Sequence, residues 1–358
     1  MANIKEVAEA CEVSIATVSN IFNGKGRVSE ETKERIIRIA KEMNYVPNIM
    51  AKNLKQRRSN VIGIITEDLT VFNSVGIVDG IHEFLEEHGY SFLLGNLRLY
   101  KKYNNDFYHK DEYHQQVQEE FNIMKSAQVA GVIYVCAHCR EIKFLPEMDQ
   151  VPVAIAYGFA KNERVSSIIY DDEQAAYDVT NEMICNGHRE IGLIMGDKLS
   201  MHTNARLKGY QRALYDNSIL FNPGYIYEGD WSREKGRDAA EDLIKKGVSA
   251  IFSMNDEMAA GVYDYAHETN LIIGKELALV GFDNREICTA FLPALTTMAI
   301  PLTEIGRKAA ELIVNNLDEQ GTYLIVNNLD EQGTYDGYQN YVKCSLVKRD
   351  SVNIIEGY

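Results

Sequence analysis

Hydrophobic positions in the first 45 residues recur with the spacing of three short helices. Apolar residues at i, i+3, i+4 and i+7 line one face of a helix. The residues that share an inward face are Ile4, Val7, Ala8 and Cys11 in the first segment, Val18, Ile21 and Phe22 in the second, and Ile36, Ile39, Ala40 and Met43 in the third. The pattern therefore predicts three short helices around one small core.

Polar residues at the ends of these segments indicate where the helices start. Glu12 and Val13 form a tight turn, after which Ser14 is placed to cap the second helix, and Ser29 is placed to cap the third. Two helices joined by a short turn and backed by a third predict a helix-turn-helix unit. Such a unit places its second helix in the major groove of DNA.

A short hinge segment follows this head. Pro47 ends the third helix, because the residue before a proline is disfavoured in the helical conformation. Residues 48–56 then have the pattern of one short helix, followed by the basic pair Arg57 and Arg58. Nine residues are too few for a stable isolated helix. We therefore expect this hinge helix to form only against a partner.

From residue 61 onward, short apolar runs alternate with helical patterns, while residues 97–113 lack a period and are expected to form a loop. The expected strands are 61–65, 90–94, 131–135, 151–156, 167–170, 190–195, 224–228, 249–254 and 277–281. The alternation predicts parallel sheets with helices on both faces. Because the rhythm restarts at Ser167, we expect two such sheets in series. The predicted fold is an all-α helix-turn-helix head plus an α/β body, with a two-lobed periplasmic-binding-protein-like architecture.

Charge divides the chain into two parts of opposite sign. The 358 residues include 37 Lys and Arg against 52 Asp and Glu, a formal net charge of −15. Residues 1–58 contain eleven basic and seven acidic side chains, a net charge of +4, so the remaining 300 residues carry −19. A basic head suits DNA phosphates, and an acidic body stays off the duplex. A solvated surface of mixed charge is the alternative, and charge alone does not decide.

Composition also indicates the cellular compartment in which the protein is expected to act. The chain has no stretch of eighteen apolar residues and no signal-peptide core, so we expect a soluble cytoplasmic protein that has no contact with a membrane. Six cysteines in a chain of this length do not form a disulfide framework, which fits a reducing compartment.

Several spaced blocks resemble, in the same order, the lactose/galactose repressor (LacI–GalR) family of transcriptional regulators. The blocks are Ile4-Lys5-Glu6-Val7-Ala8, Val13-Ser14, Ala16-Thr17-Val18-Ser19, Asn44-Tyr45-Val46-Pro47-Asn48 and Ala51 through Leu54. The resemblance implies a homodimeric repressor that binds a roughly palindromic, double-stranded operator. It also implies a small-molecule effector, expected to be a sugar or glycoside, bound between the two lobes of the body.

The resemblance assigns DNA contacts to the second helix. The family's base-contacting positions correspond to Ile15, Ala16 and Asn20. Asn can pair with an adenine edge, whereas Ile and Ala offer only apolar contact to a thymine methyl group. Many relatives have Arg where Asn20 stands, so we expect no guanine contact there. The residues placed for phosphate contacts are Ser14, Thr17, Asn23, Arg27 and Ser29. Local helix capping is the alternative for Thr17 and Ser29.

Three hinge residues complete the expected DNA site, and all of them match the family's minor-groove element. Leu54 corresponds to the leucine that inserts between base pairs, together with its twin from a second subunit, and kinks the duplex. Ala51 matches a small residue that lets the backbone approach the groove. Asn48 is expected to contact DNA as well.

The resemblance also assigns an effector site in the body. Arg206 matches the arginine with which the family holds its ligand from the second lobe. Asn255 and Asp283 match strand-end residues that hydrogen-bond ligand hydroxyls, and Trp231 matches a tryptophan that borders the sugar. Guanidinium, amide and carboxylate groups suit a polyol, and an aromatic face suits a pyranose. The alternatives are that Asp283 caps a turn and that Trp231 belongs to the core.

Four further residues are expected to line the cleft. Phe72 and Asn73 follow the first strand of the first lobe. Tyr157 and Tyr170 lie at strand ends that we assign to the second lobe.

Cys136-Ala137-His138-Cys139 admits three interpretations: a zinc half-site, a redox pair or an ordinary loop with buried thiols. We favour the last, because a closed zinc site needs four ligands and no second CxxC exists. The chain has no nucleophile elbow, no P-loop and no dinucleotide-binding glycine motif. We therefore expect neither an enzyme nor a bound metal or cofactor.

Residues 312–323 are repeated without change as residues 324–335. A single twelve-residue tandem repeat does not make a solenoid, which needs several longer units. One copy suffices for the end of a helix and a crossover, so we expect the second copy to be a surface excursion. We favour an accident of cloning or of sequence assembly over a functional duplication.

The expected domains are a head of residues 1–58 with a hinge helix at 48–56, a first lobe of residues 59–158 and 289–318, a second lobe of residues 159–288 and 336–358, and a crossover of residues 319–335. In this arrangement residues 292–300 and the helix at 302–317 belong to the first lobe, and one strand at 341–347 completes the second. A sugar-binding protein without gene control and a regulator that depends on a protein partner remain open as alternatives.

Overall fold

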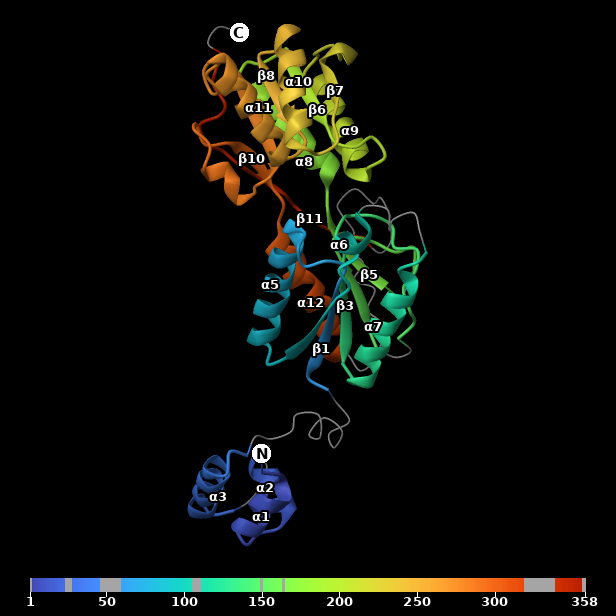
Figure 1. Cartoon of the computed structure of the whole chain (residues 1–358), viewed down its shortest axis with the longest axis vertical. Helices are drawn as coiled ribbons and strands as arrows, with labels where there is room; N and C mark the ends of the chain where they lie inside the picture. The colour runs from blue at the N-terminus through green and yellow to red at the C-terminus, as the bar shows by residue number, and fades with distance from the viewer. Residues whose placement is uncertain are drawn as a thin grey trace. The chain divides into compact units, whose positions relative to one another are not determined.

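The structure is a computed structural model that describes residues 2–22, 28–45, 59–104, 111–148, 151–162, 165–318 and 339–355. The chain divides after Asn60 into two compact units, a helical head and an α/β body, which Figure 1 shows with their elements labelled. The hinge segment at 48–56 and the second copy of the repeat lie outside the described residues, so our expectations for them stay predictions.

The described part of the head consists of the three predicted helices, α1 (Ile4–Ala10), α2 (Ile15–Phe22) and α3 (Glu30–Glu42). Their inward faces meet in one small core built on Val7, Val18 and Ile36, each of which is fully buried. Asn3 and Glu6 form a capping box at the start of α1. The apolar periodicity of the sequence is thus confirmed in all three helices.

The described residues of the body form two six-stranded sheets. The first has the order β11 (Gln339–Val342), β5 (Val165–Tyr170), β4 (Val153–Ala156), β3 (Gly131–Val135), β1 (Val61–Thr66) and β2 (Ser91–Asn96), with all pairs parallel. The second has the order β12 (Ser345–Val347), β10 (Thr296–Ala299), β9 (Ala278–Asp283), β8 (Ala250–Ser253), β6 (Ile191–Met195) and β7 (Ile226–Glu228). Its pairs are parallel except for β12 with β10, which is antiparallel.

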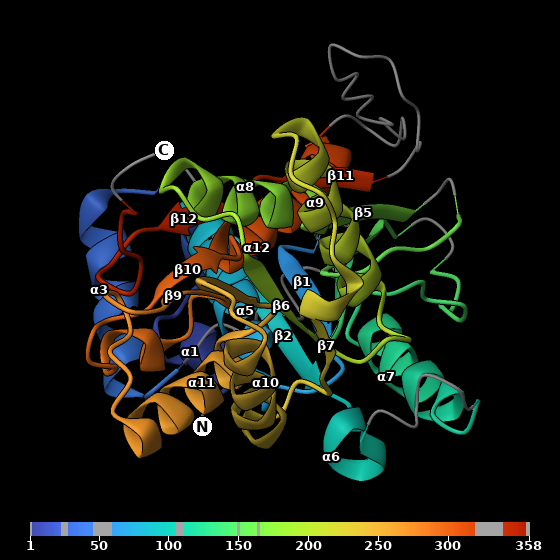
Figure 2. The ribbon, with the colours of Figure 1, turned by 90° about the horizontal axis from the view of Figure 1, so that it is seen from above.

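Helices cover both faces of each sheet. In the first lobe, α5 (Phe72–Glu87) and α12 (Leu302–Asp318) lie on one face, and α7 (His114–Ser126) lies on the other (Figure 1). In the second lobe, α8 (Asp172–Cys185) packs on α9 (Met201–Asp216), and α10 (Arg233–Lys245) packs on α11 (Asp256–Thr269), one pair on each side of the sheet (Figure 2). The 3₁₀ turns Pro223–Tyr225 and Glu286–Thr289 precede β7 and follow β9.

Two glycines allow α5 and α12 to approach closely. A Cβ atom at Gly80 would collide with the backbone carbonyl of Thr303, and one at Gly306 would collide with that of Ile77. Because neither glycine has a side chain, α12 can pack directly against α5 and stay in contact with the first lobe.

The strand pairing corrects several expectations about the lobes. β5 pairs with β4 in the first sheet, so residues 165–170 belong to the first lobe and not to the second. β10 pairs with β9 in the second sheet, so the expectation that residues 292–300 lie in the first lobe was wrong. The single strand expected at 341–347 is instead two strands, β11 in the first sheet and β12 in the second. Pairing is set by contacts distant in sequence, which apolar periodicity does not report.

A further correction concerns the segment 97–113, which we expected to be a loop. Leu99–Tyr103 form the short helix α6. This helix is held by long-range bonds, because the Leu99 N–H donates to the Glu67 carbonyl at 2.8 Å and the Lys101 N–H donates to the Asp68 carboxylate at 2.9 Å. In the described part of the chain, no helix is long and apolar enough to span a bilayer.

Candidate functional site

The second helix of the head turns the predicted base-contacting side chains outward. Val18 is fully buried on the inner face, whereas Ile15, Ala16 and Asn20 are exposed. Ile15 is 45% exposed although it is a large apolar residue. The structure thus brings the three predicted residues together on one exposed face of α2, and their contacts with bases stay a prediction.

The hydroxyl groups of the head are engaged in local capping. Ser14 Oγ accepts a hydrogen bond from the Thr17 N–H at 3.1 Å and lies 2.9 Å from Thr17 Oγ1. Ser29 Oγ accepts from the Thr32 N–H at 3.3 Å. The structure therefore supports local capping for Thr17 and Ser29, and a phosphate contact would be an additional role.

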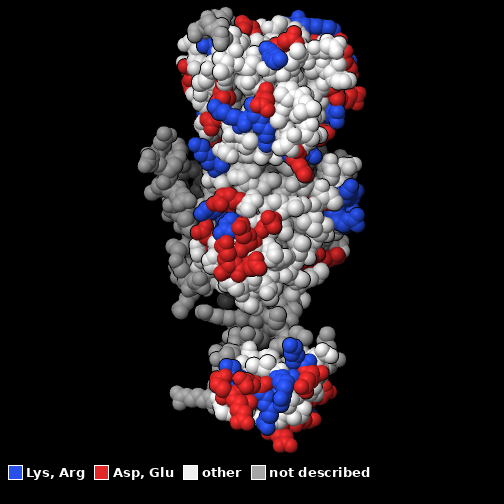
Figure 3. Space-filling model, turned by 90° about the vertical axis from the view of Figure 1, so that its left-hand side faces the viewer, with Lys and Arg blue, Asp and Glu red and all other residues white. Residues whose placement is uncertain are grey.

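The described part of the head is not basic. Residues 2–22 and 28–45 contain five Lys and Arg and seven Asp and Glu, and the other six of the eleven basic residues fall at 23–27 and 46–58. Both signs of charge occur side by side on the face of the head that Figure 3 shows. The predicted DNA contacts Asn23, Arg27, Asn48, Ala51 and Leu54 lie in the same undescribed segments.

In the body, the predicted effector residue Arg206 lies at the centre of a buried polar cluster where the chain passes between the lobes. Its Nε donates to Asp172 Oδ1 at 2.7 Å, its Nη2 donates to the Tyr170 hydroxyl at 3.0 Å, and its Nη1 donates to the carbonyl of Met254. Tyr170 is the last residue of β5 in the first lobe, and Asp172 is the first residue of α8 in the second. One guanidinium group therefore bonds to both lobes.

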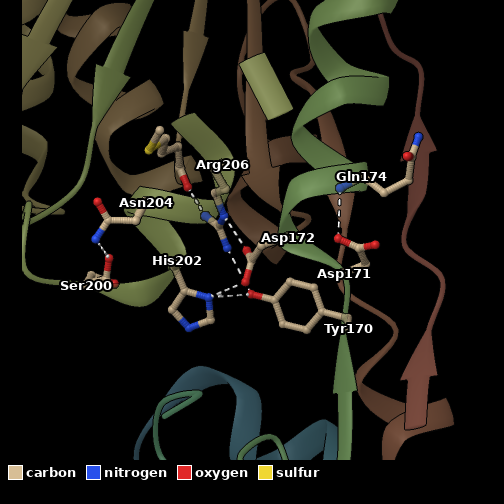
Figure 4. Close-up of polar contacts among 9 residues, drawn as sticks. Tyr170, Asp171, Asp172, Gln174, Ser200, His202, Asn204 and Arg206 are labelled. Carbon is tan, nitrogen blue, oxygen red and sulfur yellow. Dashed lines mark hydrogen bonds and ion pairs between the residues drawn. The ribbon is translucent and has the colours of Figure 1, made fainter. Parts of the chain in front are cut away.

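Two members of this cluster were missed by the sequence analysis, Asp172 and His202. His202 Nδ1 lies 2.6 Å from Asp172 Oδ2 and 3.1 Å from the Tyr170 hydroxyl (Figure 4). Burial alone would raise the pKa of the Asp172 carboxyl group, but His202 and Arg206 hold this pKa below its usual value. Asp172 is the second residue after the predicted strand 167–170, a common place for a carboxylate, so the sequence did not single it out. His202 precedes Arg206 by four residues, which places both on one face of α9.

Aromatic rings surround the cluster. The Arg206 guanidinium carbon lies 3.5 Å from the centroid of the Phe282 ring and 5.8 Å from that of Trp231. Trp231 is also partly buried against the hydrophobic core, which fits the alternative given for it, and its contact with a sugar stays a prediction. Tyr157 and Tyr170 lie close to His202, with ring centroids 6.1 and 5.9 Å from the imidazole. Tyr170 ends β5 and Tyr157 directly follows β4; both strands belong to the first sheet, so assigning these strand ends to the second lobe was wrong.

Asp283 and Asn255 lie at the carboxyl ends of neighbouring strands of the second sheet. Asn255 caps α11, because its Oδ1 accepts from the Met258 N–H at 2.7 Å, and its Nδ2 donates to the Trp231 carbonyl at 3.1 Å. The turn after β9 is held by Asp256, which accepts from the Arg285 N–H at 2.7 Å and from Thr297 Oγ1 at 2.6 Å. Asp283 itself has a positive φ of 112°. Burial raises the pKa of its carboxyl group well above the usual value, opposed by Arg206 and reinforced by Asp256.

The first lobe contributes Phe72 and Asn73 from the first turn of α5. Phe72 is 38% exposed, and the Arg285 guanidinium from the second lobe lies 5.6 Å from the centroid of its ring. Asn73 is fully buried, and its Nδ2 donates to the Cys136 carbonyl at 3.0 Å. Its Oδ1 is buried without a hydrogen-bond partner.

A second buried ion pair, also missed by the sequence analysis, stands at the strand ends of the first lobe. Glu67 is fully buried and accepts from Arg140 Nη1 at 2.8 Å and from Arg140 Nη2 at 2.6 Å. The Tyr134 hydroxyl and the Ala137 N–H donate to the same carboxylate at 2.9 and 2.8 Å. The pair fixes the loop after β3, because Arg140 anchors it to the end of β1.

This loop carries the Cys136-Ala137-His138-Cys139 motif. Burial raises the pKa of both thiols well above the usual value, so both are protonated at neutral pH. Burial, with His202 and Arg140 nearby, lowers the pKa of His138 to about 3, so His138 is neutral. The described residues contain no group of three or more His, Cys, Asp or Glu side chains that could hold a metal ion. Cys136 is buried and Cys139 is partly buried, which fits the interpretation as an ordinary loop.

A helix-turn-helix head on a two-lobed α/β body, with a buried arginine cluster between the lobes, defines a ligand-responsive regulator. Comparisons with known proteins agree with this class. Residues 3–48 match the family described as bacterial regulatory proteins, lacI family, and residues 180–352 match a periplasmic binding protein-like domain.

The chain is 30% identical over 324 residues to the HTH-type transcriptional repressor CytR of Escherichia coli (strain K12), covering 89% of this chain and 91% of that protein. It is 29% identical over 325 residues to catabolite control protein A of Priestia megaterium, covering 88% of this chain and 93% of that protein. A crystal structure of the lac repressor dimer bound to operator and the anti-inducer ONPF has the same fold, with a TM-score of 0.73, 23% identity, and coverage of 98% of this chain and 99% of that chain. The chain belongs to the LacI family of bacterial transcriptional regulators.

Proposed function

We propose that the chain is a homodimeric transcriptional repressor that binds operator DNA through its head and a small-molecule effector, a sugar or glycoside, between the lobes of its body. The relatives are named as a transcriptional repressor and a catabolite control protein, and the lac repressor structure is a dimer on its operator. We infer that the chain acts in the cytoplasm, where the operator is accessible, and that it is not an enzyme.

The observation that carries this proposal is the position of Arg206. Its hydrogen bonds reach Tyr170 at the end of the first sheet, Asp172 at the start of α8 and the Met254 carbonyl after β8. A ligand that takes over one of these bonds changes the interaction between the lobes. The effector and the operator are then coupled, and the coupling is reciprocal: an effector that lowers operator affinity binds the DNA-bound protein more weakly by the same factor.

Operator binding is tested first. DNA from upstream of the chain's own gene and its neighbours is footprinted with the purified protein, and a protected, roughly palindromic site is the expected result. A sugar-binding protein without gene control would protect no site. A regulator that needs a protein partner would protect DNA only when extract is added.

Effector binding is tested with Trp231, the single tryptophan of the chain. A saturable change in its emission with a mono- or disaccharide would place it beside the ligand. The same sugar should then shift operator affinity in the footprinting assay.

The hinge assignment has its own test. Leu54→Ala should weaken binding to the specific operator while leaving nonspecific, salt-dependent binding nearly intact, because an inserted leucine acts only on the kinked site. Titrations with operator and with unrelated DNA at several salt concentrations separate the two effects. Equal losses of affinity for both DNAs would contradict the proposed insertion of Leu54 between base pairs.

A further inference from the structure

The second lobe contains an aromatic residue in a backbone conformation that such residues rarely adopt. Trp231 has a φ of 74°, in the left-handed region that is unfavourable for a bulky side chain. A residue keeps such a conformation only where its surroundings hold it there, and functional sites are a common place for it. Three contacts hold Trp231, and they come from the ends of β6, β7 and β8, which are neighbours in the second sheet.

The first contact lies in the turn that follows β7. The Asp230 carboxylate accepts a hydrogen bond from the Ser232 N–H at 3.0 Å and another from the Ser232 hydroxyl at 2.5 Å. Ser232 also caps α10, because its Oγ accepts from the Lys235 N–H at 3.3 Å. The residues on both sides of Trp231 are therefore bonded to each other, which fixes the turn.

The second contact is with bare backbone at the end of β6. A Cβ atom at Gly196 would collide with three atoms of the Trp231 indole, so a side chain at this position would occupy space that the ring fills. Gly196 precedes the turn that leads into α9. The guanidinium carbon of Arg206, on that helix, lies 5.8 Å from the centroid of the indole. The ring thus packs against the start of the segment that carries Arg206.

The third contact comes from Asn255, which follows β8 and is only 7% exposed. Its Nδ2 donates to the Trp231 carbonyl at 3.1 Å, and its Oδ1 accepts from the Met258 N–H at 2.7 Å. The carbonyl of the preceding residue, Met254, accepts a hydrogen bond from Arg206. Two consecutive residues after β8 therefore hold the aromatic ring and the guanidinium group beside each other.

We infer that Asn255 is a positioning residue of the effector site: it holds the Trp231 indole against Gly196 and acts on a bound molecule through this ring. A ring that is already in place loses little conformational freedom when a ligand packs on it, so its positioning raises affinity without a direct contact. The inference rests on the proposed effector site. It gives Asn255 a role other than the hydroxyl contact that its motif suggests.

Two substitutions separate this role from the capping of α11. Asn255→Ser retains a residue that caps helices well, but the serine side chain is too short to reach the Trp231 carbonyl as well. Asn255→Asp also caps, and a carboxylate has no donor for that carbonyl. Both variants should loosen Trp231, the single tryptophan of the chain, so acrylamide should quench its emission more strongly than in the native chain. This measurement requires no effector.

The matched control is Asp171→Ser, which exchanges one capping residue for another on α8, on the other side of the sheet (Figure 2). Its quenching should equal that of the native chain, and circular dichroism checks that every variant is folded. Unchanged quenching in both Asn255 variants would leave capping as the role of this residue and overturn the inference. An equal increase in the control would overturn it as well.

A substitution on the opposite side of the ring gives an independent check. Gly196→Ala leaves Asn255 unchanged but places a methyl group where the indole lies. It should therefore displace the ring and increase the quenching of Trp231. Unchanged quenching would contradict the packing of the indole on Gly196. If Gly196→Ala does not fold, the two Asn255 variants still decide.

A double-mutant cycle tests whether Asn255 acts through the ring. The native chain and the variants are titrated calorimetrically with glucose, galactose and cellobiose. For a sugar that binds the native chain, Asn255→Ser should weaken binding, but it should add no further loss to Trp231→Ala, because the positioned ring is then already absent. Additive losses would indicate a direct contact of Asn255 with the sugar and overturn the inference. Failure of all three sugars to bind would instead count against the proposed effector class, and the quenching measurements would still decide the positioning role.

Discussion

At the scale of single residues, Arg206 combines a structural role with the role in effector binding that we propose for it. Its side chain is 3% exposed and its partner Asp172 is 10% exposed, so the charges of this ion pair are almost completely removed from water. Removing one member of such a pair leaves the other charge buried and uncompensated.

Arg206→Ala should therefore lower the free energy of unfolding of the body by about 3–5 kcal/mol and abolish the response to effector. Arg233→Ala is the matched control, because Arg233 pairs with Asp264 on the surface with 49% and 37% of the side chains exposed. Its expected cost is only about 0–1 kcal/mol. Denaturant unfolding and effector titration measure the two effects. A similar stability loss in both variants would contradict the buried role of Arg206.

Asp283 should make stability depend on pH. Its pKa in the folded chain is raised above the unfolded value, so its stabilising contribution is present at low pH and is lost as the pH rises above about 4. Asp283→Asn removes this titration and retains a side chain that tolerates the positive φ of 112°. The variant should match the native chain near pH 4 and exceed its melting temperature at pH 8. A difference that is constant across this range would contradict the raised pKa.

Some of the candidate site residues could be predicted from the sequence, and others could not. Arg206, Asn255 and Asp283 stand in motifs that survive as linear patterns, so they could be named in advance. Asp172 and Glu67 could not, because a carboxylate after a strand is common and only the fold shows which arginine it meets. Asn255 also shows a limit of motif transfer, since its amide already caps α11 and bonds the Trp231 carbonyl.

At the scale of elements, the head depends on very few buried side chains. Ile36 on α3 is fully buried against α1 and α2, while its neighbour Ile37 is 45% exposed. A core this small gives the head only a small free energy of unfolding, so the loss of one buried side chain can unfold it.

Ile36→Ala should cost about 2–5 kcal/mol and unfold the head, which abolishes operator binding. Ile37→Ala changes the same residue type at an exposed position and should leave operator binding nearly intact. Effector titration should be normal in both variants, because the body is a separate compact unit with its own core. Loss of effector binding in Ile36→Ala would show that the two units do not fold independently.

Individual helices and strands were predictable where a long apolar period marks them. The helical patterns that alternate with the expected strands correspond to helices such as α9 (Met201–Asp216) and α11 (Asp256–Thr269). The sheet to which a strand belongs was not predictable, as β5 and β10 show, because each could complete either lobe until its partner is known. The five-residue helix α6 was missed for a related reason: Asp68 and Glu67, distant in sequence, hold it in place.

At the scale of the whole molecule, the tandem repeat raises the question of whether the protein needs both copies to fold and to function. Its first copy supplies the end of α12, where Leu312, Ile313 and Val314 are buried against the first lobe. Removing either copy yields the same single-copy chain, because the two are identical.

Deletion of residues 324–335 should therefore leave the melting temperature, operator affinity and effector response of the protein unchanged within error. Thermal unfolding and the footprinting assay with effector check this expectation. A large loss of stability in the single-copy chain would show that the duplication serves the fold.

The placement of β11 and β12 at the outer edges of the two sheets has a consequence for how the protein is made. Both strands lie close together near the end of the described chain, so neither sheet can be completed while the ribosome is still translating the body. Until then, β5 and β10 present open edges that can pair with other nascent chains. The three helices described for the head, by contrast, all lie within the first 45 residues, so they can fold as soon as they emerge. A message broken before this point would therefore release a DNA-recognition unit on an unfinished body with unpaired sheet edges, which is prone to aggregate.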